Sequence, residues 1–244
     1  MDKIKITIDG KQVECVRDQC VLEVALNAGI YIPSLCWHPE VKNSGGSCRV
    51  CLVEAHQEGR SRLVTACNFP VREGLEIITD SELVKRIRRQ VLENMLTRKP
   101  DDKIIHEIAA KLEIKNLRVF ENDQDDTWDA CLACGLCVHV CEEIVGVCAI
   151  SMLDRGFQKR PGTPYDKPSA DCIGCGACAY VCPTQSIVME DTGDIRKIWG
   201  REFKMICCSY CGKPYIPEAQ VEWIVNKTGK ERSYFDTCQD HRGM

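Results

Sequence analysis

The sequence predicts an α+β protein in which four small modules follow one another along the chain. Three observations predict this. Short segments with strand or helix periodicity open the chain, an eleven-residue cysteine motif occurs twice, and the cysteines fall in spaced groups. Cysteine is the outlier of the composition, with 19 residues in 244. Modules too small to bury a core of their own can still fold around a metal or cluster, because metal binding contributes folding free energy.

Two uses of cysteine compete in such a composition. Disulfide frameworks belong to short secreted chains, whereas this chain is longer, has an odd number of cysteines and begins MDKIKITIDG, without a signal-like apolar run. Its spacings are those of metal ligands, so we expect ligation in a cytoplasmic protein. The net charge of −4 gives no support to a nucleic-acid surface, and no stretch reaches the apolar length of a transmembrane helix.

Residues 1–79 are expected to form a small sheet domain. The alternating isoleucines from Ile4 to Ile8 and the Asp9-Gly10 pair predict a hairpin. Gly29 is suited to end a short helix, because glycine takes the left-handed conformation found just after many helices. The elements expected after the hairpin are this helix and three strands, at residues 21–28, 50–53, 63–66 and 75–78.

Four cysteines of this domain have the spacing C-x11-C-x2-C-x15-C. They are Cys36, Cys48, Cys51 and Cys67. Four thiolates suffice for a [2Fe–2S] cluster, and Gly45 and Gly46 let the backbone wrap closely around it. A structural zinc site at the same cysteines is the alternative. Cys15 and Cys20 lie outside the pattern and are expected to be small buried residues.

Residues 80–127 are predicted to form a helical linker. Thr79 to Glu82 resembles a capping box, and apolar residues at helical spacing follow as far as Pro100. A weaker helical pattern covers residues 104–112. Residues 123–126 form an acidic patch that we expect to be solvated.

Residues 128–190 contain one motif twice, as CLACGLCVHVC and CIGCGACAYVC. This is the spacing of two-cluster ferredoxins, in which the fourth cysteine of each run ligates the other cluster. We therefore predict two [4Fe–4S] clusters, with zinc or disulfides as the alternatives. One ligand set is Cys131, Cys134, Cys137 and Cys182, and the other is Cys172, Cys175, Cys178 and Cys141. Cys148 lies outside both sets and is expected to be a buried thiol.

Residues 191–244 form a tail with a further ligand pattern. Cys208, Cys211, Cys238 and His241 follow the spacing C-x2-C-x26-C-x2-H, which fits a tetrahedral zinc site of the Cys3His type. The alternatives are another iron–sulfur cluster held by Cys207, Cys208, Cys211 and Cys238, or no metal. The tail also contains four aromatic residues that we expect to form its core: Trp199, Phe203, Trp223 and Tyr234.

Several of these motifs resemble a known family. The run from Ile32 to Cys36, the Cys-Glu-Glu sequence at 141–143 and the sequence GTPYDKP at 162–168 are similar to three kinds of protein. They are the N-terminal region of iron-only hydrogenase large subunits, the large iron–sulfur subunit of complex I and the diaphorase small subunit of NAD-linked hydrogenases. The resemblance covers residues 1–190. It implies a β-grasp [2Fe–2S] ferredoxin domain followed by a bacterial-type two-[4Fe–4S] ferredoxin domain.

The chain departs from that family in the linker. Relatives of this kind usually hold one more [4Fe–4S] cluster there, with one histidine and three cysteines. Residues 98–120 contain His106 but no cysteine. We therefore predict that this cluster is absent and that His106 is an ordinary helix residue.

No sequence feature indicates a substrate-converting site. There is no G-x-G-x-x-G motif after a strand and no nucleophile with a matched base. We expect an electron-transfer subunit of an NAD(H)-linked oxidoreductase. By resemblance, its partners are an FMN/NAD(H)-binding flavoprotein, a thioredoxin-like [2Fe–2S] subunit, and ferredoxin or a catalytic subunit. An electron-bifurcating complex is one such setting. The alternatives are a freestanding multi-cluster carrier and a redox sensor, although no switching module is visible.

Overall fold

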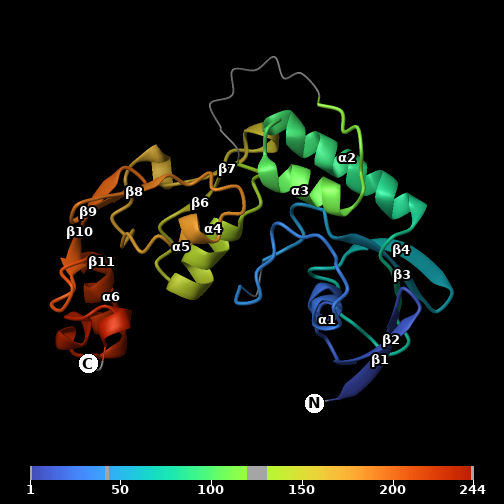
Figure 1. Ribbon diagram of the computed structural model, residues 1–244, viewed down its shortest axis with the longest axis horizontal. Helices are drawn as coiled ribbons and strands as arrows, with labels where there is room; N and C mark the ends of the chain where they lie inside the picture. Colours follow the sequence, from blue (N-terminus) through green and yellow to red (C-terminus); the bar gives the residue numbers. More distant parts are fainter. Residues whose placement is uncertain (1, 42–43, 120–130, 243–244) are drawn as a thin grey trace. The chain divides into compact units, whose positions relative to one another are not determined.

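The computed structural model describes residues 2–41, 44–119 and 131–242 of the chain. They form two compact units, Met1–Leu136 (unit 1) and Cys137–Met244 (unit 2). Both units contain helices and strands, which confirms the predicted mixture of the two (Figure 1). The predicted acidic patch at residues 123–126 lies outside the described residues.

Unit 1 begins with a five-stranded sheet in the order β2-β1-β5-β3-β4. Strand β1 pairs with β5 in parallel, and the other neighbours pair antiparallel. Helix α1 (Val21–Asn27) packs its apolar face against this sheet. The hairpin, the helix and the three later strands are confirmed, with slightly shifted ends. The strands are β1 (Lys3–Ile8), β2 (Lys11–Val16), β3 (Leu52–Gln57), β4 (Arg60–Thr65) and β5 (Glu76–Ile78).

The first turn and the first strand follow directly from the sequence. Ile4, Ile6 and Ile8 are all buried, at 4%, 1% and 0% exposure, because alternate side chains of a strand share one face. Asp9 and Gly10 both have positive φ angles, of 48° and 78°. Such a pair matches the two-residue turns that suit the twist of a hairpin.

Two helices complete unit 1. They are α2 (Glu82–Arg98) and α3 (Lys103–Lys111). Ser81 is the N-cap of α2, because its side chain accepts a hydrogen bond from the Val84 N–H at 3.2 Å. The predicted capping role of Thr79 is therefore wrong. The backbone N–H and the hydroxyl of Thr79 instead donate to the carboxylate of Asp9, 70 residues away, which a local motif cannot reveal.

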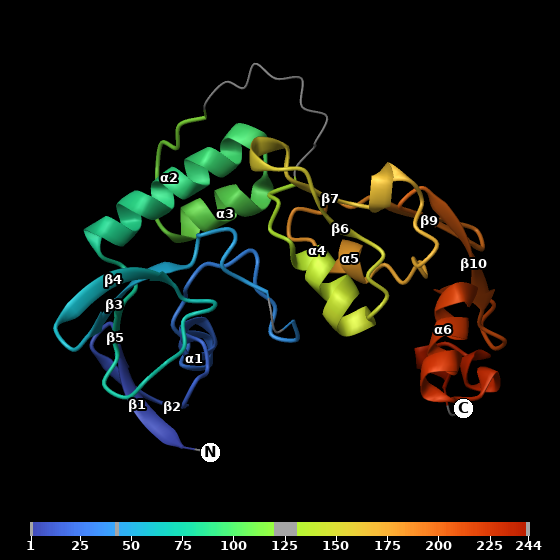
Figure 2. The ribbon, with the colours of Figure 1, turned by 180° about the vertical axis from the view of Figure 1, so that it is seen from behind.

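Helices α2 and α3 lie side by side in both ribbon views (Figures 1 and 2). Their apolar faces bury the loop that carries the first cysteine group. Leu92 and Leu96 of α2 and Ile105 of α3 are fully buried in one core with Leu35, Cys36, Cys48 and Val50. The segment expected to be a linker thus serves as the cover of that loop.

Unit 2 carries the second cysteine motif and the tail. Cys141 lies in a π-helical turn (Val140–Val145) that ends at Gly146, where φ is 80°. The tail contains a four-stranded antiparallel sheet, in the order β11-β10-β9-β8, that we did not predict. The strands of this sheet are β8 (Met189–Thr192), β9 (Ile195–Ile198), β10 (Arg201–Cys207) and β11 (Pro214–Pro217). Helix α6 (Glu218–Thr228) follows β11.

The remaining elements are short. They are α4 (Leu136–His139), α5 (Ala177–Tyr180), β6 (Ser151–Leu153), β7 (Arg160–Gly162) and the 3₁₀ turns Gly156–Gln158, Pro164–Asp166, Arg232–Phe235 and Gln239–His241. In the part of the chain that the structure describes, no helix has both the length and the apolar character that a bilayer crossing needs.

Candidate metal centres

The first cysteine group is buried around one loop of unit 1. Cys36, Cys48, Cys51 and Cys67 are 1%, 6%, 0% and 4% exposed. Backbone N–H groups point at their sulfurs: Cys48 donates to Cys36 Sγ at 3.4 Å, and Gly46 donates to Cys67 Sγ at 3.0 Å. Such donors stabilise negative charge on sulfur, as a ligating thiolate requires.

Gly45 shapes the same loop. Its φ of +109° is one that side-chain-bearing residues rarely adopt, and a Cβ atom there would lie 2.8 Å from Cys67 Sγ. Only a residue without a side chain allows the backbone to pass so close to that sulfur. This close approach is what a cluster-binding loop needs.

Three thiols of this group, those of Cys36, Cys48 and Cys67, have raised pKa values. Contact with the Cys36 side chain, followed by burial, raises the pKa of the Cys48 thiol. Because crowded, desolvated thiols resist ionisation, a bound cation is needed to hold them as thiolates. The burial of the four cysteines and the N–H groups that point at sulfur are compatible with a metal cluster here.

A second set of cysteines surrounds a narrow cavity in unit 2. Cys141, Cys172, Cys175 and Cys178 all line it, and these are the members of one predicted [4Fe–4S] ligand set. The other described lining residues are valine, alanine, isoleucine, glycine and Trp199. Burial raises the pKa of the Cys178 thiol to about 11, although the Trp199 indole N–H acts in the opposite direction. An apolar cavity lined by four cysteines suits a cubane cluster.

The remaining predicted set joins residues from both units. Cys131 and Cys134 belong to unit 1, whereas Cys137 and Cys182 belong to unit 2, so this ligand set stays a prediction. Within unit 2, Cys182 Sγ accepts a hydrogen bond from the Ser186 N–H at 3.3 Å.

The tail brings its four predicted ligands together. The ligand atoms of Cys208, Cys211, Cys238 and His241 all lie within 4.8 Å of one another. His241 Nδ1 lies 3.1 Å from Cys238 Sγ and 3.8 Å from Cys208 Sγ. This is a Cys3His donor set compact enough for one tetrahedral ion.

Backbone N–H groups also favour the thiolate at this site. Donation from Cys238, at 3.3 Å, and from Cys211 lowers the pKa of the Cys208 thiol to about 6. The neighbouring Cys207 is exposed and is not part of the group. The geometry therefore favours the set with His241 over the alternative set with Cys207.

Several cysteines and aromatic residues outside the ligand sets differ from expectation. Cys148 is exposed rather than buried, and its φ is positive, at 51°. Tyr234 is 41% exposed rather than part of the tail core, and Lys230 and Arg242 lie over its ring. Cys15 is buried as expected, whereas Cys20 is half-buried and caps α1 by accepting from the Glu23 N–H at 3.4 Å.

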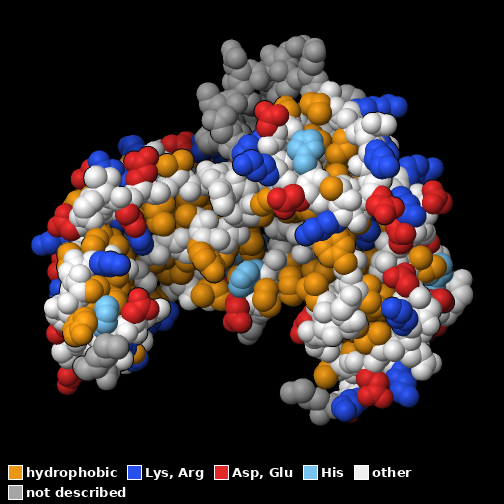
Figure 3. All heavy atoms as spheres, viewed as in Figure 1, with side chains coloured by type: hydrophobic (Ala, Val, Ile, Leu, Met, Phe, Trp, Pro, Cys, Tyr) orange, Lys and Arg blue, Asp and Glu red, His pale blue; other side chains and the backbone are white. Residues whose placement is uncertain are grey.

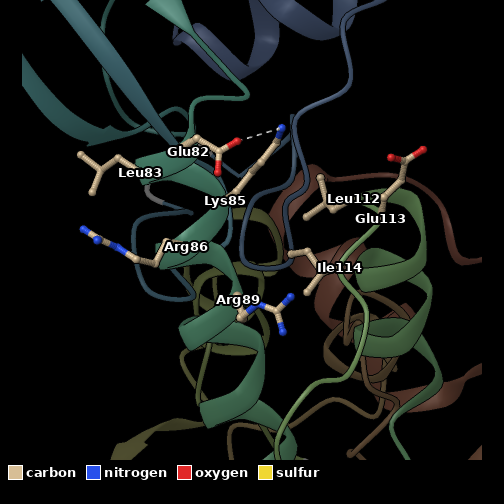
Figure 4. Close-up of a pocket in the computed structure, with 8 residues that line it drawn as sticks. All are labelled: Glu82, Leu83, Lys85, Arg86, Arg89, Leu112, Glu113 and Ile114. Carbon is tan, nitrogen blue, oxygen red and sulfur yellow. Dashed lines mark ion pairs between the residues drawn. The ribbon is translucent and has the colours of Figure 1, made fainter.

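A separate cavity in unit 1 contains no ligand-type sulfur. It has a volume of about 630 Å³ and lies between α2 and the end of α3 (Figure 4). None of its described lining residues is a cysteine, and two of its basic side chains have partners. Lys85 pairs with Asp80 at 3.1 Å and with Glu82 at 3.8 Å, and Arg89 donates to the Lys115 carbonyl at 2.9 Å. Basic and acidic side chains are mixed on the visible face (Figure 3).

Comparisons with known proteins match two of these regions. A family model described as "2Fe-2S iron-sulfur cluster binding domain" matches residues 1–82, and one described as "4Fe-4S binding domain" matches residues 169–188. A chain from the crystal structure of NAD⁺-reducing [NiFe]-hydrogenase in the H2-reduced state is similar with a TM-score of 0.62 and 30% identity. The match covers 75% of this chain and 85% of that one.

The chain belongs to this family of iron–sulfur subunits. Curated relatives agree. The NADPH-Fe(3+) oxidoreductase subunit alpha of Geobacter sulfurreducens is 32% identical over 85% of this chain and 26% of that protein. The NADP-reducing hydrogenase subunit HndD of Solidesulfovibrio fructosivorans is 30% identical over 77% of this chain and 36% of that protein. The mitochondrial NADH-ubiquinone oxidoreductase 78 kDa subunit of Candida albicans is 26% identical over 66% of this chain and 25% of that protein.

The iron–sulfur subunit spans about a quarter of the length of the first curated relatives it matches. The expected family resemblance is confirmed. The ligand sets stay predictions, although the structure brings the four tail ligands together and lines one cavity with Cys141, Cys172, Cys175 and Cys178. Sequence reasoning missed the contact of Trp199, whose indole N–H donates to Cys178 Sγ at 3.4 Å. The available signal was the Trp199-Gly200 pair between two alternating segments, which fits a two-residue hairpin turn.

Gly45→Ala tests the first centre. The new Cβ would displace Cys67 Sγ, so we expect retention of the [2Fe–2S] cluster to weaken about 10- to 100-fold, the usual cost of disturbing a ligand's support. Electron paramagnetic resonance (EPR) of the reduced protein measures this. The control is Gly59→Ala, where φ is also positive, at 74°, but no atom lies within 4 Å of the added Cβ. Equal [2Fe–2S] signals in the two variants would contradict the tight approach described for Gly45.

The tail site is tested by comparing two neighbouring cysteines. Cys208→Ser removes one of four ligands and is expected to lower zinc retention by at least about tenfold. Cys207→Ser should leave zinc unchanged, because Cys207 is exposed and outside the group. Elemental analysis of the two purified variants gives the answer. Loss of iron rather than zinc, in both variants, would instead support the alternative cluster that uses Cys207.

Proposed function

We propose that the subunit holds one [2Fe–2S] cluster, two [4Fe–4S] clusters and one zinc ion, and relays single electrons in an NAD(P)H-linked oxidoreductase. The observation that carries the proposal is the cavity of unit 2, whose four thiols are one complete predicted ligand set. When bound, such clusters supply one-electron carriers, and the chain supplies their placement and surroundings.

Each of the three clusters is assigned its own set of four cysteines. Cys36, Cys48, Cys51 and Cys67 would hold the [2Fe–2S] cluster, and Cys141, Cys172, Cys175 and Cys178 would hold one [4Fe–4S] cluster. The last set, for the other [4Fe–4S] cluster, is Cys131, Cys134, Cys137 and Cys182. Backbone N–H groups donate to the sulfurs of the first set, and an apolar lining excludes water from the second. Both effects stabilise particular charge states of a bound cluster.

The linker is proposed to hold no cluster. No cysteine lies between Cys67 and Cys131 in the sequence. The one histidine of α3, His106, places its Nε2 atom 2.7 Å from the Pro100 carbonyl oxygen. This contact gives the imidazole a structural partner, which supports its assignment as an ordinary helix residue.

Zinc in the tail would be structural. Cys208 and Cys211 flank the turn after β10, and Cys238 and His241 lie at the last 3₁₀ turn. One ion bound by all four would join two segments that are separated by α6. A closed four-ligand site has no open position for a substrate, so we assign it no chemistry.

The proposed partners come from the relatives. Their names describe oxidoreductases and hydrogenases that use NADH, NADPH or NADP. We propose that an FMN/NAD(H)-binding flavoprotein exchanges electrons with this subunit. A thioredoxin-like [2Fe–2S] subunit would accompany it, and ferredoxin or a catalytic subunit would be the low-potential partner. Electron bifurcation is one setting for this arrangement. The large cysteine content suits the reducing cytoplasm, where we place the complex.

Reduction by NADH tests this function. The complex is purified anaerobically through an affinity tag on this chain, and NADH or NADPH is then added. We expect bleaching of the cluster absorbance in the flavin-containing complex. The isolated chain should not react, because it has no hydride-accepting site of its own.

Two outcomes would contradict the proposal. The first is a complex with bound flavin whose cluster absorbance stays unchanged when NADH or NADPH is added. The second is an isolated chain that several unrelated reductases reduce equally well, which would favour a freestanding carrier.

A further inference from the structure

The turn between β9 and β10 contains a tryptophan, which is unusual at this position. Trp199 and Gly200 both have positive φ angles, of 52° and 70°, as a two-residue hairpin turn requires. The first position of such a turn favours asparagine, aspartate or glycine, and a bulky residue there is strained. A strained backbone position at a candidate site points to a role for its side chain.

The indole of Trp199 reaches a proposed cluster ligand. Its Nε1 atom donates to Cys178 Sγ at 3.4 Å. Trp199 also lines the cavity that Cys141, Cys172 and Cys175 line. Apart from the thiols, it is the one described lining residue whose side chain carries a hydrogen-bond donor, because the others are aliphatic or glycine.

The hairpin that carries Trp199 is fixed against the cysteine loop. Arg201 Nη1 lies 2.7 Å, 2.9 Å and 2.7 Å from the carbonyl oxygens of Ser169, Ala170 and Cys172. Arg196 Nη1 donates to the Gly174 carbonyl at 3.2 Å.

Packing adds to these hydrogen bonds. A Cβ at Gly174 would lie 2.6 Å from the ring of Phe203, so the strand and the loop are in close contact. The indole is thus held by regular structure on both sides, which makes its hydrogen bond a fixed feature of the unit.

A donor to a ligating sulfur affects the two redox states of a cluster unequally. The reduced cluster carries one more negative charge, so the hydrogen bond stabilises it more than the oxidised form and raises the reduction potential. In this apolar cavity no other side-chain N–H of the described lining competes with that effect.

We infer that Trp199 sets the reduction potential of the [4Fe–4S] cluster of Cys141, Cys172, Cys175 and Cys178 by hydrogen bonding to Cys178. This inference rests on the proposed function. It gives the β9–β10 hairpin of the tail a role in tuning electron transfer, beyond the proposed role of the tail in zinc binding.

Trp199→Phe tests the inference, because phenylalanine keeps an aromatic ring and removes the N–H. The holoprotein is titrated anaerobically and each cluster is followed by EPR. We expect a lower midpoint potential for one [4Fe–4S] cluster, full iron and sulfide content, and unchanged potentials for the other clusters. The control is Trp223→Phe on α6, whose ring lies under Lys227 at 4.3 Å and does not line the cavity; it should shift no potential.

A second measurement does not depend on how the variant folds. Protein with ¹⁵N-labelled tryptophan and otherwise unchanged sequence is reduced, and pulsed EPR should detect ¹⁵N coupling to one [4Fe–4S] signal. Absence of that coupling would overturn the inference.

Two results distinguish failure of the inference from failure of the proposed function. An unchanged potential in Trp199→Phe at full cluster content would overturn the inference and leave the proposed function intact. If the unchanged protein had no [4Fe–4S] cluster at these cysteines, both would fail.

Discussion

A buried thiol whose pKa is raised stays neutral unless a cation shares the negative charge of its thiolate, and this constraint governs two cysteine groups of the iron–sulfur subunit. In unit 1, crowding by Cys36 raises the pKa of Cys48. In unit 2, burial raises the pKa of Cys178 to about 11. Apolar side chains line the cavity of Cys178, and Cys36 and Cys48 share one core with Leu92, Leu96 and Ile105. Backbone N–H groups that point at sulfur, such as that of Gly46, provide the remaining stabilisation of negative charge.

Two of the cysteine groups are covered by segments that have no ligand of the group that they cover. Leu92, Leu96 and Ile105 of the predicted linker bury the first loop. Arg196, Trp199 and Arg201 of the tail hold the second loop through its carbonyl oxygens and through Cys178. The linker thus buries the first loop, and the tail supplies a hydrogen bond to sulfur through Trp199. Solvent exposure and hydrogen bonds to sulfur are two of the factors that determine the potential of a bound cluster.

The sequence predicted what depends on spacing and periodicity. Ligand spacing predicted the Cys3His set of the tail, and the fold brings its four ligand atoms within 4.8 Å of one another although α6 lies between its two halves. The ligand role of the Cys36 group stays a prediction. Alternation identified β1. Tertiary partners were not predictable in this way. Thr79 binds Asp9 rather than capping α2, and Trp199 donates to a cysteine 21 residues earlier in the chain. No local sequence pattern indicated the π-helical turn of Val140–Val145 or the exposure of Cys148.

The central claim, that clusters rather than isolated metal ions occupy the cysteine groups, is tested most directly by elemental analysis of anaerobically purified protein. The account predicts about 10 iron, a matching amount of acid-labile sulfide and about one zinc per chain. A protein with a few zinc ions and no sulfide would contradict it, because the cysteine groups would then be structural zinc sites unable to carry electrons.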